Sequence, residues 1–102
     1  MTEAKPYDAS DEDAVSQRKK AAKRREEERL DALKAIMSHE NGRSYVFWLL
    51  TACHVYHTSF SSNALTMARS EGERNIGLLV LADLTKTAPD EYLQMIKENQ
   101  DG

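Results

Sequence analysis

The sequence predicts an all-α protein, a small bundle of about four helices with a projecting charged N-terminal helix. Three observations favour this fold class. Glycine and proline are absent from Asp13 to Met37, where residues that favour helix dominate. Apolar residues recur at helical spacing along Ile76–Leu84, and turn or cap residues separate the remaining stretches. With 102 residues, the chain holds one domain at most.

The first predicted helix begins near the capping residues Ser10 and Asp11 and continues to about Met37. Its first half offers few apolar side chains, whereas from Leu30 onward it carries an apolar stripe at helical spacing. The helix is therefore expected to start as a projecting arm and to end as part of a core. We predict three parts: a flexible tail over 1–10, a charged helical arm over 11–29 and a compact helical domain over 30–99.

The arm carries its charge in blocks. The first 29 residues hold eight acidic and eight basic residues, yet six of the bases lie close together. In one interpretation they belong to a solvated helix with pairs such as Lys23–Glu27 and Arg24–Glu28, each worth about 0.2–0.5 kcal/mol. In the others they bind an acidic surface of a partner protein or the phosphates of a nucleic acid. The six bases are Arg18, Lys19, Lys20, Lys23, Arg24 and Arg25.

A turn at Asn41 and Gly42 is predicted to separate this helix from the next. The second helix is expected to run from Gly42 or Arg43 to Cys53 or His54. Its segment 45–50 is almost wholly apolar, so most of this helix is expected to be buried. A strand is the alternative, because tyrosine, valine, phenylalanine and tryptophan favour sheets, but the sequence offers no second matching strand.

The third helix is predicted over Asn63–Leu84, with Asn63 as its cap. Gly72 lies in its middle, where glycine costs about 1 kcal/mol relative to alanine. We favour close packing of Gly72 against another helix, beside Trp48; close approach of a binding partner is the alternative. Pro89 then starts a fourth helix. The predicted core comprises Phe47, Trp48, Leu50, Ile76, Leu79, Val80 and Leu84.

Neither a catalytic site nor a metal site is predicted. Cys53, His54 and His57 are the best metal-ligand candidates, but a structural zinc site needs four ligands and only His39 remains. The sequence has no phosphate-binding glycine loop and no G-x-S-x-G nucleophile motif. We therefore expect no enzymatic activity and no cofactor.

The chain is expected to act with partners and without a membrane span. Its apolar runs are far shorter than the roughly 20 residues that a span needs, and its N-terminus lacks a signal-peptide core. The single cysteine allows no intrachain disulfide. A compact part of about 70 residues rarely supplies more than about 3–5 kcal/mol. Oligomerisation or docking on a larger assembly is therefore expected, through the second helix and the apolar stripe of the third.

Several short motifs of the compact part resemble those of a known family. They include E-G-x-R-N-x-G-L at 71–78 and P-D-E-Y-L at 89–93. Over Leu30–Ile96 the chain resembles a small helical domain family of tailed bacteriophages, which is named after a Bordetella podophage protein. The residues that carry the resemblance are Gly42, Arg43, Thr58, Ser59, Phe60, Asn63, Glu71, Gly72, Arg74, Asn75 and Gly77.

The resemblance implies a virion or virion-assembly protein and brings no catalytic residue with it. The first hypothesis is a non-enzymatic protein, oligomeric or assembly-bound, that docks on other phage structural proteins at the portal or head–tail region or inside the capsid. The alternative is a small helical protein that binds nucleic acid or a host factor during infection. The expected location is the virion, or the host cytoplasm during assembly.

Overall fold

A computed structural model describes residues 9–56 and 63–100 of the chain. It contains four helices, α1 (Ala9–Met37), α2 (Glu40–Ala52), α3 (Ala64–Thr87) and α4 (Pro89–Glu98). No strand occurs in the described ranges, so the all-α prediction is confirmed. The alternative of a strand at 45–50 is wrong, because these residues lie inside α2. The tail predicted for 1–10 lies almost wholly outside the described residues.

Local signals fix the ends of α3 and α4. The side chain of Asn63 accepts hydrogen bonds from the backbone N–H groups of Leu65 and Thr66, at 2.9 and 3.1 Å. These bonds satisfy two of the N–H groups that have no partner within the first turn of a helix. Pro89 occupies the first turn of α4, where its missing N–H costs nothing. The predicted cap and the predicted start of the fourth helix are both confirmed.

The turn between α1 and α2 lies earlier than predicted. It is formed by Ser38 and His39, and α2 already begins at Glu40. His39 is extended, with φ −116° and ψ 141°, and the chain changes direction there within two residues. Gly42 therefore lies in the first turn of α2 rather than in the connection. A Cβ there would collide with the backbone carbonyl of Ile36, so the residue permits close contact between the end of α1 and the start of α2.

The end of α2 is a Schellman motif that the sequence did not reveal. His54 has φ 64°, the left-handed conformation that this motif requires. Its N–H bonds to the carbonyl of Thr51 at 3.0 Å, and the N–H of Val55 bonds to the carbonyl of Leu50 at 3.1 Å. Val55 then packs against the core and lies beside Gly77 of α3.

The core is small and every helix contributes to it. Of the predicted core residues, Leu50 and Leu84 are fully buried, while Phe47 and Val80 are half-buried and pack against the buried cluster. This cluster comprises Met37, Val46, Leu50, Leu84, Ala88 and Met95.

The core prediction is wrong for Trp48, Ile76 and Leu79, which are 58%, 59% and 64% exposed. Trp48 comes two residues after Val46, so the helix places it on the opposite side of α2 from the core. Ile76 and Leu79 lie about 80° and 140° around α3 from buried Leu84, outside the strip of this helix that the core covers. In the described chain, neighbouring helices cover only part of the apolar surface of α2 and α3. The rest of that apolar surface is exposed to solvent.

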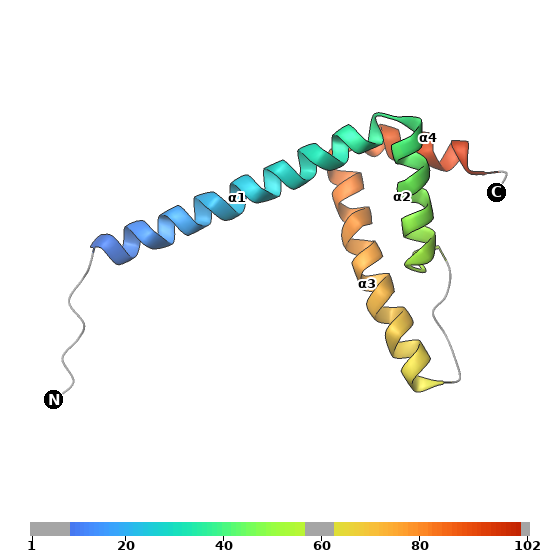
Figure 1. The fold of residues 1–102 in the computed structure, drawn as a ribbon, viewed down its shortest axis with the longest axis horizontal. Helices are drawn as coiled ribbons and strands as arrows, with labels where there is room; N and C mark the ends of the chain where they lie inside the picture. The colour runs from blue at the N-terminus through green and yellow to red at the C-terminus, as the bar shows by residue number, and fades with distance from the viewer. Residues whose placement is uncertain (1–8, 57–62, 101–102) are drawn as a thin grey trace.

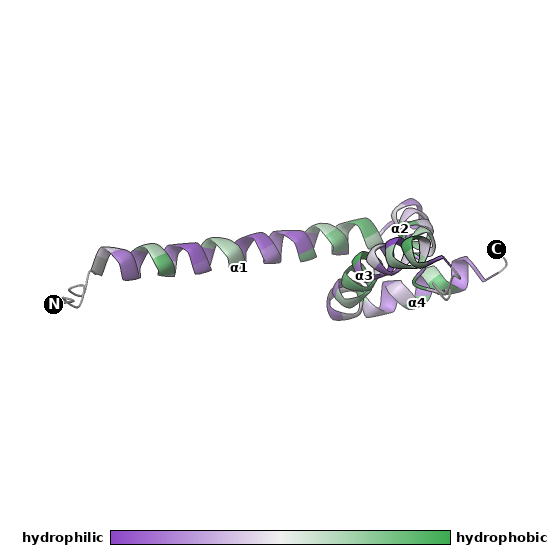
Figure 2. Ribbon diagram, turned by 90° about the horizontal axis from the view of Figure 1, so that it is seen from below, coloured by the Kyte–Doolittle hydropathy of each residue, from purple (hydrophilic) through white to green (hydrophobic). Residues whose placement is uncertain are grey.

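Helix α1 makes the molecule elongated (Figure 1). Its last turns pack on the other helices, whereas its N-terminal part projects away from them. The radius of gyration is 20.2 Å, whereas a compact chain of this length has about 13 Å. Figure 2 shows that α1 is mostly hydrophilic along the projecting part and more hydrophobic near its junction with the other helices. No described helix is long and apolar enough to cross a membrane.

Candidate protein-docking surface

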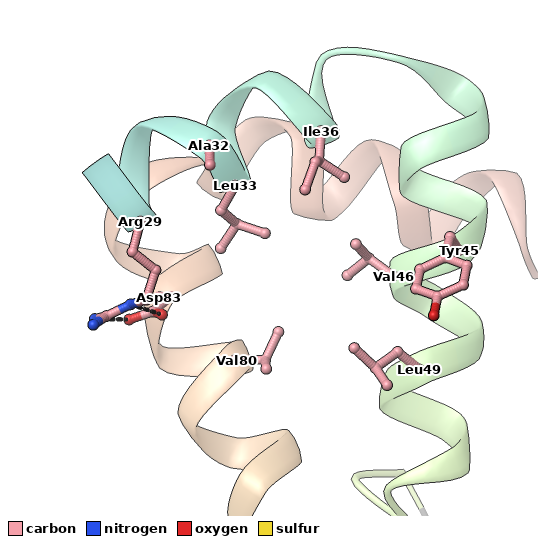
Figure 3. A pocket seen from close by; sticks show the side chains of 9 residues that line it. All are labelled: Arg29, Ala32, Leu33, Ile36, Tyr45, Val46, Leu49, Val80 and Asp83. Atoms are coloured by element: carbon pink, nitrogen blue, oxygen red, sulfur yellow. Dashed lines mark hydrogen bonds and ion pairs between the residues drawn. The ribbon is translucent and has the colours of Figure 1, made fainter. Parts of the chain in front are cut away.

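An apolar groove lies where α1, α2 and α3 meet (Figure 3). Its volume is about 340 Å³. Aliphatic side chains from all three helices point into it, and Tyr45 stands at its edge. A groove of this chemistry binds apolar side chains and has little to offer a charged ligand. The principal lining residues are Leu33, Ile36, Tyr45, Val46, Leu49 and Val80.

Two ion pairs join α1 to α3, and the residues of one of them, Arg29 and Asp83, also line the groove. The guanidinium of Arg29 donates to both carboxylate oxygens of Asp83, at 3.1 and 3.3 Å. This hydrogen bonding, together with the carboxylate charge, raises the pKa of Arg29. One turn earlier, Glu26 accepts a longer bond of 3.4 Å from Lys86. In the described chain, α1 is therefore in contact with α3 as early as Glu26.

Aromatic residues extend the apolar surface beyond the groove. The rings of Tyr45 and Trp48 lie 5.4 Å apart in a tilted arrangement, and both side chains are exposed. Ile36 is exposed on the α1 side of the same groove. Exposed aromatic and aliphatic side chains that cluster around a concavity are typical of protein–protein contact sites.

The basic residues of the arm do not form the ion pairs that were predicted for a solvated helix. Neither Lys23–Glu27 nor Arg24–Glu28 is an ion pair in the described structure, so the prediction of these two pairs is wrong. Glu26, the first acid after the block, pairs with Lys86 of α3. The six bases at 18–25 are all exposed. They remain available to an anionic partner.

Arg43, one of the motif residues, connects three helices through hydrogen bonds. Its guanidinium donates to both oxygens of Glu98, at 2.7 and 2.9 Å, and to the carbonyl of Met37 at 3.0 Å. One side chain thus joins the end of α1, the first turns of α2 and the end of α4. The hydrogen bonds with Glu98 raise the pKa of Arg43, and they lower the pKa of Glu98.

The two glycines inside α3 differ sharply in their surroundings. A Cβ at Gly77 would lie 2.5 Å from Cγ2 of Val55 and 2.7 Å from Cβ of Cys53, so Gly77 permits α3 to pack on the end of α2. A Cβ at Gly72 would have nothing within 4 Å. The expected packing of Gly72 against another helix, beside Trp48, is therefore wrong for the described chain. Sequence position alone could not distinguish the two.

The remaining motif residues contribute less to the fold. Glu71, Arg74 and Asn75 make no side-chain hydrogen bond or ion pair within the described parts of the chain, and Glu71 and Asn75 are exposed. Asn63 is the cap described above. The motif residues Thr58, Ser59 and Phe60 lie outside the described residues.

The structure does not bring the described metal-ligand candidates together as a metal site. His54 is engaged with Glu73, whose Oε2 lies 2.7 Å from its Nε2, and this contact links the end of α2 to α3. Cys53 is a half-buried free thiol, and His57 lies outside the described residues. Within the described ranges, no group of three or more histidine, cysteine, aspartate or glutamate side chains is arranged to hold a metal ion.

Sequence reasoning missed the long-range pairs that shape this surface. Arg29–Asp83 joins residues 54 positions apart, and Arg43–Glu98 joins residues 55 positions apart. No local pattern connects such positions. The sequence around a charged residue on a predicted helix does not reveal whether its side chain is solvated or paired with a residue of another helix.

The fold and its surface define a small all-helical protein with an open apolar groove, exposed aromatic side chains and a projecting charged helix. Residues 33–97 match the family described as Bbp19-like phage protein. Because the match covers well over half of the 102 residues, the chain belongs to this family of bacteriophage proteins. The family resemblance predicted from the motifs is thereby confirmed. No curated protein and no solved structure matches the chain.

Proposed function

We propose that the chain is a non-enzymatic virion or virion-assembly protein that docks on other phage structural proteins, at the portal or head–tail region or inside the capsid. The observation that carries the proposal is the apolar groove between α1, α2 and α3, which stays open in the isolated chain. Membership in a phage protein family supplies the setting.

The occupant of the groove in this proposal is an amphipathic helix of a phage structural protein. Leu33, Val46 and Val80 come from three different helices and face a common space, which suits a row of aliphatic side chains on one helical face (Figure 3). Tyr45 and Trp48 would then cover the edge of the bound helix. Large aromatic side chains of this kind carry much of the binding energy in protein interfaces.

The arm would add an electrostatic contact with an acidic surface of the same partner. Six exposed bases on a projecting helix accelerate association with a negatively charged surface, and salt weakens this effect. The groove would supply most of the affinity, because exposed charge pairs each contribute little.

The non-enzymatic part of the proposal is supported by the chemistry of the groove. Its polar lining residues are Arg29, Asp83 and Tyr45, and the first two are engaged with each other. The groove thus offers no nucleophile beside a free general base, which covalent or acid–base catalysis requires.

The test combines copy number with binding. Gradient-purified particles of the source phage are analysed by peptide mass spectrometry against the major capsid protein, and a fixed copy number is expected. The purified portal, head–tail and capsid proteins are then tested one at a time for binding to the full chain. Ile36→Asp and Tyr45→Asp, both in the groove, are expected to abolish binding. Leu93→Asp on α4, which is equally exposed, is the matched control.

The basic block favours a second candidate, a protein that binds nucleic acid or an acidic host factor during infection. Six phosphate contacts would give a slope of roughly −5 for the logarithm of the DNA-binding constant against the logarithm of salt concentration. The docking proposal expects little affinity for free DNA. Tight, steeply salt-dependent DNA binding by a chain that binds none of the purified phage proteins would refute docking and favour this alternative.

A further inference from the structure

A second hollow lies in the angle between α1 and α3 (Figure 1). Its volume is about 370 Å³, and none of its lining residues comes from α2, which forms one wall of the docking groove. Its apolar floor is open to solvent, because Ile76 and Leu79 are both mostly exposed. We call this hollow the α1–α3 corner. It is lined by Arg29, Ile76, Leu79, Val80, Ala82 and Asp83.

The unpaired charge on the α3 side of the corner is positive. At 3.6 residues per turn, Arg69 falls within roughly 80° of both Ile76 and Leu79 on the helix surface. Arg69 is exposed and forms no ion pair in the described ranges. The other two charged residues on this side of α3, Asp83 and Lys86, are paired with side chains of α1. In the described part of α3, the apolar floor therefore has a free cation beside it and no free anion.

The arm carries the same sign of charge along α1. Arg18, Arg25 and Arg29 each fall within roughly 20° of Ile36 around this helix. Arg29 and Ile36 line the docking groove, and Arg29 also lines the corner, so this side of α1 borders both hollows. Arg25 lies one turn before Arg29, about 6 Å along the helix axis. Neither Arg18 nor Arg25 forms an ion pair in the described ranges, so two free guanidinium groups border the corner from the arm.

We propose that the α1–α3 corner binds an acidic amphipathic helix of a partner protein. The apolar side of that helix packs on Ile76 and Leu79, and carboxylates on its flanks pair with Arg69 and Arg25. The open side of α3 from Leu65 to Leu79 is about 21 Å long, which accommodates about four turns of a bound helix. The corner and the docking groove are separate sites, so each binds its partner whether or not the other is functional.

Shape and chemistry favour a helix over other anionic partners. The phosphates of a nucleic acid gain nothing from an apolar floor such as Ile76 and Leu79. An anionic membrane binds basic and apolar side chains that share one outward face of a helix, whereas here they line the two walls of an angle. Gly72 has open space where a Cβ would lie, and it lets the backbone of a bound helix come close to α3.

The test is the binding of two labelled synthetic peptides to the full chain, measured by fluorescence anisotropy. Both peptides carry leucines at helical spacing and no tryptophan; one has glutamates at its polar positions, and the other has lysines there. The acidic peptide is expected to bind, whereas the basic peptide is not. Arg25→Glu and Arg69→Glu are each expected to raise the Kd about three- to tenfold, because each replaces an attraction by a repulsion at an exposed position. Ile76→Asp is expected to abolish binding.

Two control variants separate the corner from general charge and from the groove. Arg24 has the same charge as Arg25 but lies roughly 140° around α1 from Arg29, so Arg24→Glu is expected to bind the acidic peptide like the wild type. Tyr45→Asp alters the docking groove from α2 and is expected to leave peptide binding unchanged. Trp48 is expected to stay accessible to acrylamide while the peptide is bound. Far-UV circular dichroism checks that every variant remains folded.

Several results would overturn the proposal. They are absence of binding by the acidic peptide, equal binding of the two peptides, and equal losses in Arg24→Glu and Arg25→Glu. Loss of binding in Tyr45→Asp, or protection of Trp48, would place the peptide in the groove instead. Binding to phosphatidylglycerol vesicles that Ile76→Asp abolishes would assign the corner to a membrane surface. A dimer in sedimentation velocity that Ile76→Asp abolishes would assign it to a second copy of the chain.

Discussion

The two glycines of α3 allow a paired test of the structure, because alanine is expected to act in opposite directions at the two positions. Gly72→Ala adds a methyl group that meets nothing within 4 Å. It is therefore expected to stabilise the free chain by about 1 kcal/mol, the difference in helix propensity between the two residues. Gly77→Ala gains the same propensity but must place its methyl group between Val55 and Cys53.

The geometry at Gly77 sets the size of the opposing effect. The added Cβ would lie 2.5 Å from Cγ2 of Val55 and 2.7 Å from Cβ of Cys53, and the Cys53 atom moves only with its backbone. Overpacking of this kind costs about 1–3 kcal/mol, and the upper end applies because two close contacts form together. After the gain in propensity, a net loss of about 2 kcal/mol remains. This is a large share of the about 3–5 kcal/mol that such a small core supplies.

Urea unfolding of both variants, followed by far-UV circular dichroism at concentrations where the chain is monomeric, measures the two changes. Equivalent thermal shifts are about 4–8 °C upward for Gly72→Ala and at least as large downward for Gly77→Ala. A Gly77→Ala chain as stable as the wild type would refute the close approach of α3 to the end of α2. A loss of stability in Gly72→Ala would show that its side of α3 is covered in the monomer.

Three further outcomes follow from the described contacts. Leu84→Ala removes a fully buried side chain and is expected to cost about 2–5 kcal/mol, so its urea-unfolding midpoint, followed by far-UV circular dichroism, should fall well below that of the wild type. Arg43 lowers the pKa of Glu98 below its ordinary 4.5, so the stability from this pair is present above that pH and is lost as the pH falls through the lowered pKa. Glu98→Gln is therefore expected to flatten the acid limb of the stability profile, measured by urea unfolding between pH 6 and pH 3. Trp48, the only tryptophan, is exposed; its fluorescence is expected to be quenched readily by acrylamide and to lose that sensitivity when a partner helix fills the groove.

The features that the sequence predicted correctly depend on neighbouring residues. Asn63 caps a helix because the N–H groups it binds are two and three positions away, and Pro89 starts a helix because its own ring favours that position. The helical nature of α1 follows from the propensities of its residues. The fold class could therefore be read from the chain before any tertiary contact was known.

The errors share a different cause. Trp48, Ile76 and Leu79 are as apolar as the residues that are buried, and periodicity shows only that a helix has apolar sides. Which side is covered depends on where the neighbouring helices lie, and that is set by packing between residues far apart in the sequence. The contacts Arg29–Asp83 and Arg43–Glu98, for example, each span more than 50 positions. The groove could not be located from the sequence for the same reason, because its lining comes from three separate helices.

The large apolar side chains of this molecule are divided unusually between core and surface. The fully buried large side chains are Met37, Leu50, Leu84 and Met95, while a greater number of large apolar side chains are exposed in the described chain. A free monomer gains nothing from that arrangement, since exposed apolar surface contributes to stability only when something covers it. Any partner that binds the folded chain but not the unfolded chain adds its binding free energy to stability. The groove would then serve both recognition and folding, and stability should rise with the concentration of the partner that fills it.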